Sequence, residues 1–279
     1  MTLPPATHLR HGVRAVNLTQ PNSHTNIAFF KLLSVTLMPS PCPSQSPKLK
    51  IRVDCCACNL NRICLPSGMP PDEIDSLSDI VRRDRPLRKG ESIYHAGERF
   101  SGIFALKSGA AKLVHTDRFG NESIIAVLLP GELLGFDGLA SGRYLCSLIV
   151  LEASRYCELP SHRIEQISQR MPSLYQVLLQ RTGEQFDQSI EKIAISQRPA
   201  DERLAAFLLD LAKRYGARGF SSEQFQLSLT RQEIGNHLGL ALETVSRALG
   251  KFEAAGMIGV RGKQIHILDA ELLRRCNTH

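Results

Sequence analysis

The segment Leu229–Ile258, LTRQEIGNHLGLALETVSRALGKFEAAGMI, carries the pattern that decides the fold of the C-terminal part of this chain. It opens with a capping box, in which Thr230 and Glu233 satisfy each other's unpaired backbone amides at the start of a helix. A second helix is expected after Gly239, over about residues 242–255. The pattern therefore predicts two short helices joined by a tight turn, which is a helix-turn-helix.

The second predicted helix has one apolar and one polar face. Its apolar face carries Leu242, Val245, Leu249 and Phe252, and its polar face carries Glu243, Ser246, Arg247 and Gly250. Arginine can donate two hydrogen bonds to guanine, glutamate can accept one from cytosine, and serine can do either, so the polar face fits the major groove of DNA. An ion pair between Glu243 and Arg247 on a solvated face is the alternative interpretation.

A hairpin is predicted after this helix, in the sequence GMIGVRGKQIHILD of residues 256–269. It is typical of a wing, and its Arg261 and Lys263 could reach DNA phosphates, which favours the DNA interpretation. Thr230, Arg231 and Thr244 complete the candidate DNA contacts. Ala241 offers no side-chain acceptor at the start of the second helix, which costs about 1 kcal/mol, so packing must stabilise that helix.

Upstream, the sequence predicts a β-rich domain. The 279 residues exceed the usual size of one domain, so at least two domains are expected. From about residue 85 to residue 160, strand-like segments alternate with turn signals at Lys89-Gly90, Ala96-Gly97, Ser108-Gly109, Phe119-Gly120, Pro130-Gly131 and Ser141-Gly142. A spacing of roughly 8 to 12 residues is typical of all-β structure and predicts an antiparallel β-roll.

A long helix is predicted from Pro172 to Gln197. Its apolar residues Leu174, Leu178, Phe186, Ile190 and Ile193 recur at spacings of three and four, and only Thr182-Gly183 interrupts them. This stripe could pack on the β-roll of its own chain or on a twin helix, and its place between two domains favours the twin. The stripe is flanked by Glu184, Asp187 and Glu191, so pairing brings like charges together and leaves a dimer marginal.

The net charge of +7 says little about nucleic acid, because residues 1–50 hold five Lys and Arg and no Asp or Glu. The apolar run NIAFFKLLSVTLM, residues 26–38, is shorter than the roughly 20 residues that a membrane helix needs, so no membrane segment is expected. We therefore expect a cytoplasmic protein. Thiols stay reduced in that compartment, so clustered cysteines indicate metal or redox chemistry.

Four of the eight cysteines lie in VDCCACNLNRICLPSGM, residues 53–69. Cys55, Cys58 and Cys64 form a C-x2-C-x5-C pattern, which lets several thiolates converge on one metal centre. A fourth ligand must come from elsewhere, and Cys157 at the end of the β-roll is in a rigid place. Zinc would use the same residue types, and the spacing does not exclude it. No Ser/His/Asp, Cys/His or Walker-type constellation indicates an enzyme.

Five motifs together resemble a known family. The runs CxxCxxxxxCLP, GFDGLASG, YCELP, ERLAAFLL and LTRQEIGNHLGLALETVSR resemble the Fnr branch of the cyclic-AMP-receptor-type transcription regulators, across about residues 54–268. The resemblance implies that Cys55, Cys58, Cys64 and Cys157 bind an oxygen-labile 4Fe-4S cluster. It also implies that the long helix is the dimer interface and that Glu243, Ser246 and Arg247 read a TTGAT-type half-site.

The resemblance also implies a contact with RNA polymerase at the loop HTDRFGNES, residues 115–123. The candidate residues there are Asp117, Arg118, Gly120 and Asn121, and an ordinary hairpin turn is the alternative. Cys56 is expected to be a bystander, because three loop thiols and Cys157 already make four ligands. The long lead-in suggests that translation starts at Met38. Glu132 in GELLG resembles a cyclic-nucleotide phosphate cassette, but Arg143 is followed by Tyr-Leu-Cys, so nucleotide binding is not expected.

These expectations combine into an α+β fold: an N-terminal antiparallel β-roll sensor domain of the cyclic-nucleotide-binding type, a long dimerisation helix and a C-terminal winged helix-turn-helix. The expected divisions are a disordered tail over 1–50, a cysteine-rich loop and lead-in helix over 51–84, the β-roll over 85–170, the dimerisation helix over 171–199 and the DNA-binding domain over 200–279.

The expected function is an oxygen-responsive transcription regulator, active as a homodimer, with double-stranded DNA and RNA polymerase as partners. Its 4Fe-4S cluster would control binding to palindromic TTGAT-type sites and so anaerobic gene expression. The alternative is a regulator of the same fold that responds to a cyclic nucleotide or other effector and has a zinc-bound or inert cysteine loop.

Overall fold

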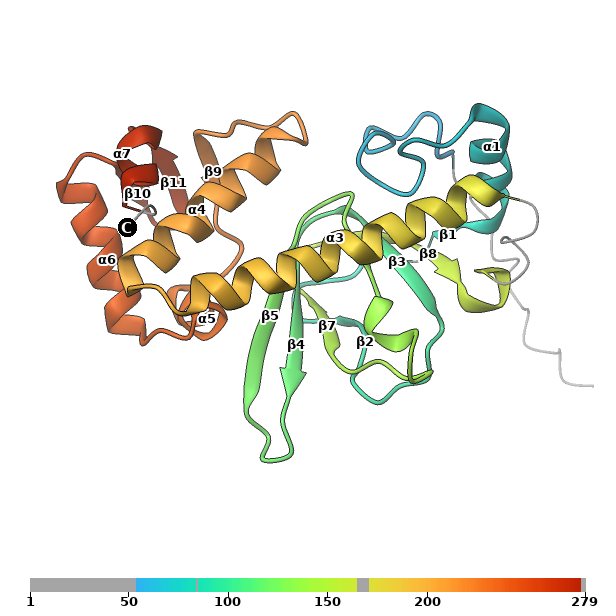
Figure 1. Cartoon of the computed structure of the whole chain (residues 1–279), viewed down its shortest axis with the longest axis horizontal. Helices are drawn as coiled ribbons and strands as arrows, with labels where there is room; N and C mark the ends of the chain where they lie inside the picture. The colour runs from blue at the N-terminus through green and yellow to red at the C-terminus, as the bar shows by residue number, and fades with distance from the viewer. Residues whose placement is uncertain (1–53, 84, 165–170, 277–279) are drawn as a thin grey trace, which may run out of the picture. The chain divides into compact units, whose positions relative to one another are not determined.

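A computed structural model describes residues 54–83, 85–164 and 171–276, all of which lie in one compact unit of the chain, residues 49–279 (Figure 1). The expected disordered tail, Cys42 and the proposed start at Met38 lie outside the described residues. No helix in the described ranges is long and apolar enough to cross a membrane.

The β-rich part of the chain consists of two four-stranded sheets. One sheet has the order β1 (Arg82–Arg83), β8 (Arg155–Pro160), β3 (Gly102–Ser108), β6 (Leu133–Leu134). The other has the order β2 (Ser92–Tyr94), β7 (Ser147–Val150), β4 (Ala111–Thr116), β5 (Glu122–Leu128). Neighbouring strands are antiparallel throughout both sheets. A short 3-10 helix, η1 (Phe136–Gly138), follows β6. The expected antiparallel β-roll is confirmed.

Six turn glycines explain why the sequence predicted these strands correctly. The residues Gly90, Gly97, Gly109, Gly120, Gly131 and Gly142 all have φ between 70° and 89°, a region that other residues seldom enter. Apolar side chains from both sheets, including Leu106 of β3 and Leu148 of β7, form one buried cluster with Tyr144 of the loop before β7. Each such side chain contributes about 1.5–3 kcal/mol when it is removed from water.

A second buried cluster lies where the cysteine loop meets the β-roll. The loop is followed by helix α1 (Pro71–Ile80), and Leu65 and Leu77 pack with Leu133 of β6. Leu174 and Val177 from the first turns of helix α3 complete the cluster, beside the loop in Figure 1. The loop is therefore packed on both the β-roll and the long helix.

Helix α3 (Pro172–Ser196) is the long helix expected between the two domains, and it runs through Thr182-Gly183 without a break. Its apolar stripe, however, is buried only in the first turns of the helix. Leu174 is fully buried and Leu178 is partly buried, both against the core of their own chain. Phe186, Ile190 and Ile193 are exposed. The first turns of the helix therefore pack on the β-roll, and packing of the remaining stripe on a twin helix stays a prediction.

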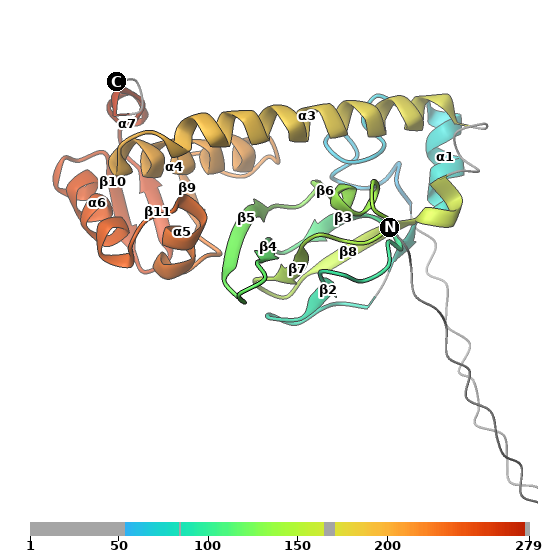
Figure 2. The ribbon, with the colours of Figure 1, turned by 60° about the horizontal axis from the view of Figure 1, so that its bottom comes forward.

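The C-terminal part (Figure 2) begins with helix α4 (Ala200–Gly216) and strand β9 (Gln224–Gln226). Helices α5 (Arg231–Leu238) and α6 (Leu242–Ala254) follow, then the hairpin of β10 (Ile258–Arg261) and β11 (Gln264–Ile267), and helix α7 (Ala270–Arg275). The three strands form an antiparallel sheet in the order β10-β11-β9. The mixed α+β class with a winged helix-turn-helix is confirmed.

Candidate metal centre and nucleic-acid interface

The cysteine loop is a succession of tight turns that is anchored at its start. Ser78 of α1 accepts a hydrogen bond from the Cys55 amide at 3.1 Å. Within the loop, the Cys58 carbonyl accepts from Asn61 N at 3.0 Å, and the Leu60 carbonyl accepts from Cys64 N at 2.9 Å. The backbone therefore folds back on itself, which keeps Cys55, Cys58 and Cys64 in one small region.

Three other cysteines lie close enough to Cys64 to affect its thiol. Burial is the main cause that raises the pKa of the Cys64 thiol; a hydrogen bond to the backbone at Leu65 lowers it, Cys157, Cys58 and Cys55 raise it, and the resulting pKa is about 12. Cys55, Cys64 and Cys157 also lie in or against one buried apolar cluster, and the Cys58 amide donates to the Cys55 carbonyl at 3.4 Å. The structure thus brings together the four cysteines that the sequence singled out.

Cys157 reaches this region from the β-roll. It lies on β8, opposite Ala105 of β3, and packs at the edge of the same apolar cluster as Cys55 and Cys64. A strand paired on both sides is a rigid support, because β8 lies between β1 and β3. One candidate ligand is therefore fixed in a sheet, while three are on a loop.

Cys56 faces a different environment. Its side chain is exposed, and its sulfur lies 3.8 Å from Asp75 Oδ1. Desolvation, followed by the carboxylates of Asp75 and Asp54, raises the pKa of the Cys56 thiol, and none of the other cysteines takes part. Negative neighbours disfavour a thiolate, so this position is poorly suited to bind iron.

The arrangement of the four thiols distinguishes between one metal ion and a cluster. Within the described ranges, no three His, Cys, Asp or Glu side chains are arranged to hold a single metal ion. In a 4Fe-4S cluster, four thiolates bind four different irons, so the thiols need to surround the cluster rather than meet at one point. The four neighbouring thiols in a mostly apolar setting fit that requirement.

The helix-turn-helix forms as the sequence predicts. Thr230 Oγ1 accepts from Glu233 N at 3.2 Å, and Glu233 Oε2 accepts from Thr230 N at 2.8 Å, which completes the capping box. Gly239 ends α5 with φ of 65°. A Cβ at Gly235 would lie 2.5 Å from the Leu240 carbonyl oxygen, so only glycine allows the turn to approach α5 this closely.

Helix α6 presents its polar face to solvent. Glu243, Arg247 and Gly250 are exposed, and Thr244 and Ser246 are partly exposed. Glu243 and Arg247 form no ion pair in the described part of the chain, and Arg247 instead donates to Thr244 Oγ1 at 3.4 Å. The opposite face is buried through Val245, Leu249 and Phe252. Leu242, expected on that face, is 37% exposed because it lies in the first turn, at the edge of the core.

The other predicted DNA contacts differ in their exposure and in whether their side chains are already hydrogen-bonded. Ala241 provides no side-chain cap to α6, as expected, and Arg231 is exposed at the start of α5. Arg261 is exposed on the wing. Lys263 is partly buried and donates to the Ser228 carbonyl at 2.9 Å, so it would have to exchange that bond for a phosphate. Among the described residues, the wing therefore offers one arginine without a side-chain partner and one tethered lysine.

The hairpin between β4 and β5 has an ordered tip. Asp117 accepts from Phe119 N at 2.7 Å and from Asn121 N at 2.9 Å, and Gly120 has φ of 85°. Hydrogen bonds from Asn121 lower the pKa of Asp117. The Arg118 guanidinium lies 4.7 Å from the Phe119 ring, whose side chain is 74% exposed. Sequence reasoning missed Phe119, although an aromatic residue between two turn formers was a signal.

The sequence also did not predict the contacts between the β-roll and the helix-turn-helix. Lys112 of β4 forms a 2.7 Å ion pair with Glu233, and Asn236 Oδ1 accepts from Ile124 N at 2.6 Å. His237 Nδ1 donates to the Ile124 carbonyl at 2.8 Å. No local pattern in the sequence indicates such pairs, because their members are more than 100 residues apart in the chain.

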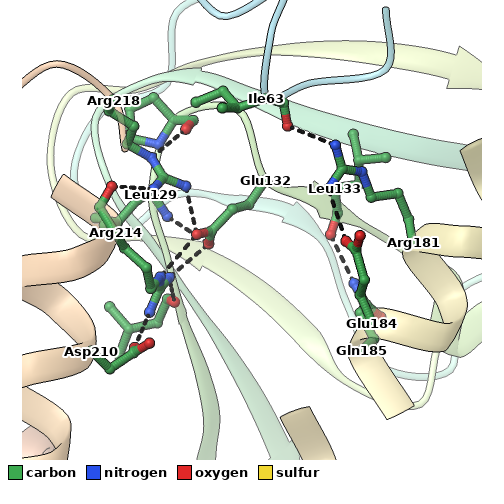
Figure 3. A network of polar contacts seen from close by, with 12 residues as sticks. Ile63, Leu129, Glu132, Leu133, Arg181, Glu184, Gln185, Asp210, Arg214 and Arg218 are labelled. Carbon is green, nitrogen blue, oxygen red and sulfur yellow. Dashed lines mark hydrogen bonds and ion pairs between the residues drawn. The ribbon is translucent and has the colours of Figure 1, made fainter. Parts of the chain in front are cut away.

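Two residues of the nucleotide-like motif are engaged inside the protein. Glu132 pairs with Arg214 at 2.7 Å and with Arg218 at 2.6 Å (Figure 3). Arg143 donates to the Gly97 carbonyl at 2.7 Å. A nucleotide would have to displace these bonds.

Helix α3 carries an exposed apolar seam. Its members Leu179, Phe186 and Ile193 are each seven residues apart, which is the repeat of a two-helix coiled coil. Tyr175 and Ile190 lie beside it and are also exposed. Glu184, one of three acidic residues flanking the stripe, is paired with Arg181 at 2.8 Å, so Asp187 and Glu191 supply most of the like-charge repulsion that a paired helix would face.

Known proteins that are similar to this chain include transcription regulators. Residues 202–276 match the family described as a Crp-like helix-turn-helix domain, and residues 84–171 match the cyclic nucleotide-binding domain. The transcriptional activator protein anr of Pseudomonas aeruginosa is 41% identical over 217 residues, covering 77% of this chain and 89% of that protein. The fumarate and nitrate reduction regulatory protein of Escherichia coli K12 is 36% identical over 228 residues, covering 81% and 91%. The structure of FixK2 from Bradyrhizobium japonicum has a TM-score of 0.65 at 25% identity and covers 72% of this chain and 98% of that one.

Proposed function

The chain belongs to the Fnr branch of the Crp/Fnr family of transcription regulators, and from that premise we propose that it is an oxygen-responsive regulator that binds a 4Fe-4S cluster and, as a dimer, palindromic TTGAT-type DNA sites. It is a DNA-binding helix-turn-helix protein and not an enzyme. The observation that carries the proposal is that Cys55, Cys64 and Cys157 lie in or against one apolar cluster, with Cys58 on the same loop and near Cys64.

The four cysteines would hold the cluster, three from the loop and one from β8. When bound, the cluster supplies an oxygen-labile link between loop and sheet. The state of the loop can affect helix α3, because Leu65 of the loop packs in the same buried cluster as Leu174 and Val177 of α3. A loop released from Cys157 would lose part of this packing and loosen the first turns of the helix.

Dimerisation would use the exposed seam of α3. Leu179, Phe186 and Ile193 cost free energy in water, and two seams facing one another would bury them. Asp187 and Glu191 oppose the pairing by only a few tenths of a kcal/mol each. A marginal dimer of this kind can be tipped by a small change at the start of α3.

DNA reading would use the exposed face of α6, with Arg247 and Glu243 on base edges and Ser246 beside them. Arg261 would contact phosphates and so position the domain without reading sequence. Two half-site contacts on one rigid dimer gain on the order of 10²–10⁴ in avidity over a monomer. Control of dimerisation is therefore control of DNA binding.

The hairpin tip would contact RNA polymerase. Its backbone is held by Asp117 and capped by an exposed stack of Arg118 on Phe119, so it has a fixed shape before a partner arrives. If DNA binding is intact but transcription is also unchanged after joint substitution of Asp117, Arg118 and Asn121, this role is excluded.

The test compares anaerobic with air-exposed protein. Anaerobic protein should have an iron-sulfur absorption spectrum, sediment as a dimer and protect a TTGAT-N4-ATCAA duplex, whereas air-exposed protein should be largely monomeric and bind weakly. Arg247→Ala should weaken specific binding by roughly 1–3 kcal/mol and leave the spectrum unchanged, because it contacts bases and not iron. Equal binding by both forms at one salt concentration would contradict the switch.

A further inference from the structure

One carboxylate of the β-roll holds two arginines of the DNA-binding domain. Figure 3 shows Glu132 in the turn after β5, facing helix α4. Its Oε1 accepts from Arg214 Nε at 2.9 Å and from Arg218 Nη2 at 2.6 Å, and its Oε2 accepts from Arg214 Nη2 at 2.7 Å. Arg214 is therefore bound at two points by one carboxylate, a geometry that fixes its angle as well as its distance.

Backbone carbonyls of β5 and of the turn after it complete the contact. Arg214 Nη2 donates to the Val127 carbonyl at 2.6 Å, and Arg218 Nε donates to the Pro130 carbonyl at 2.6 Å. The side chain of Arg218 is only 5% exposed. Because a planar guanidinium cannot rotate without losing such paired bonds, the segment from β5 to Glu132 is clamped against the end of α4.

A second contact holds the domain at another place, through Lys112 with Glu233 and through Asn236 with the edge of β5. Two separated contacts determine an orientation, which a single contact would not. Glu243 and Arg247 on α6 remain exposed in this arrangement. We call the contacts of Glu132 with Arg214 and Arg218 the clamp. The clamp thus sets the direction of helix α6 without covering its polar face.

The cysteine loop touches the same turn. The Ile63 side chain lies against Gly131, where an added Cβ would be 2.8 Å from Ile63 Cδ1. Arg181 Nη2 of α3 donates to the Ile63 carbonyl at 3.4 Å, and Gln185 Nε2 donates to the Leu133 carbonyl at 3.0 Å (Figure 3). Ile63 directly precedes Cys64 and Gly131 directly precedes Glu132, so the loop and the clamp are adjacent.

We propose that Glu132 is a positioning residue for DNA recognition, which fixes the angle at which each helix-turn-helix is held on its own β-roll, and that Ile63 connects this angle to the cysteine loop. The proposal rests on the function proposed above, because it concerns a dimer on a palindrome. Such a dimer must place two reading helices at a fixed separation, so the clamp sets which half-site spacing is bound. It acts within one protomer and is separate from dimerisation.

Glu132→Gln tests the clamp, since the amide keeps the shape and removes the charge. Anaerobic protein is titrated with TTGAT and ATCAA half-sites separated by three, four or five base pairs, and with one isolated half-site. We expect a preference for one spacing in the parent protein, on the order of tenfold, and its loss in the variant, with half-site binding unchanged. Asp210→Asn is the matched control, because it removes another carboxylate from Arg214, at 3.0 Å within α4, and leaves the clamp intact.

The cluster spectrum and the unfolding transition of Glu132→Gln establish that the variant is folded. A folded variant that keeps the parent's spacing preference would overturn the proposal. So would one that binds every duplex and the half-site more weakly by the same factor, since this indicates a merely structural role. If the parent protein binds none of the palindromes, the proposed function itself fails and this proposal fails with it.

Ile63→Ala tests the connection to the loop. We expect a partial loss of spacing preference, and no additional loss when Ile63→Ala is combined with Glu132→Gln, because both act on one contact. Arg62→Ala, at the exposed neighbouring position, should have no effect. Fully additive effects of the two substitutions would show that the loop does not act through Glu132.

Discussion

At the scale of single residues, two cysteines of the same loop differ in their surroundings. Cys64 shares an apolar region with three other thiols, whereas Cys56 is exposed beside Asp75. A sequence pattern gives the spacing of cysteines but not the direction in which each side chain points. The charges around each thiol therefore carry information that the motif lacks.

This difference leads to a prediction about the ligands. Cys56→Ser should keep the iron-sulfur spectrum and iron content of anaerobically purified protein, because its negative neighbours disfavour a bound thiolate. Cys157→Ser should lose both, since it removes the ligand from the rigid strand β8. Loss of the cluster in Cys56→Ser together with its retention in Cys157→Ser would reverse the assignment.

His237 leads to a prediction about pH. Burial, together with the positive charges of Lys192 and Arg214, lowers the pKa of His237 below its usual 6.5, although its bond to Ile124 and Asp210 act in the opposite sense. The unfolded chain then binds more protons than the folded one below about pH 6.5, so the free energy of unfolding should decrease as pH falls through that value. Denaturant titrations at pH 7.5 and 5.5 on cluster-free protein measure this.

His237→Gln is the control for that measurement, because glutamine can still donate to the Ile124 carbonyl and does not titrate. Its stability should change less between the two pH values than that of the parent protein. An equal pH dependence in both proteins would assign the effect to other groups.

Features that depend on neighbouring residues were predicted from the sequence, whereas contacts between residues far apart in the chain were not. The capping box of Thr230 and Glu233 and the uncapped Ala241 are properties of a few neighbouring residues, so their chemistry is visible in the sequence. Glu132 and Arg214 are 82 residues apart, and no periodicity relates them. The sequence drew attention to Glu132 through a resemblance to nucleotide sites, yet its partners are arginines of the same chain.

At the scale of elements, α3 shows what periodicity can and cannot predict. Leu174 and Phe186 belong to the same apolar repeat, but Leu174 is buried in its own chain and Phe186 is 67% exposed. A repeat identifies the face of a helix, whereas the partner of that face depends on which elements lie opposite. The first turns of the helix therefore pack against the β-roll, and the seam that follows is exposed.

A substitution in the seam follows from this division. Phe186→Ala should weaken dimerisation by at least about tenfold, because burying each phenylalanine contributes about 1.5–3 kcal/mol. Gln188→Ala, at an exposed position outside the seam, should not change it. Sedimentation of anaerobic protein over a concentration range measures both, and an unchanged dimer in Phe186→Ala would place the interface elsewhere.

Two glycines of the helix-turn-helix give a matched test of packing. Gly235→Ala should lower the free energy of unfolding by about 1–3 kcal/mol, because its Cβ would lie 2.5 Å from the Leu240 carbonyl oxygen. Gly250→Ala should instead raise it by up to about 1 kcal/mol, because the site on α6 is open and alanine favours the helix. Equal effects would show that the turn tolerates displacement.

At the scale of the whole molecule, the sequence predicted the two kinds of domain but not their connection. Each domain has its own local signals, namely glycine turns in one and a capping box in the other. The contacts of Glu132 and Lys112 with the DNA-binding domain depend on surfaces that exist only after both have folded. These contacts join the helix-turn-helix domain and the β-roll in one compact unit.

The order of the cysteines along the chain has a consequence for biosynthesis. Cys55, Cys58, Cys64 and Cys157 all precede the reading domain, and α3, which packs on their loop, follows directly. At about 5–20 residues per second, a ribosome needs roughly 6–25 s to add the residues after Cys157. The β-roll and the cysteine loop can therefore fold while the helix-turn-helix is still being made. On the function proposed above, a nascent chain would have its cluster-binding part in place before it is able to contact a promoter.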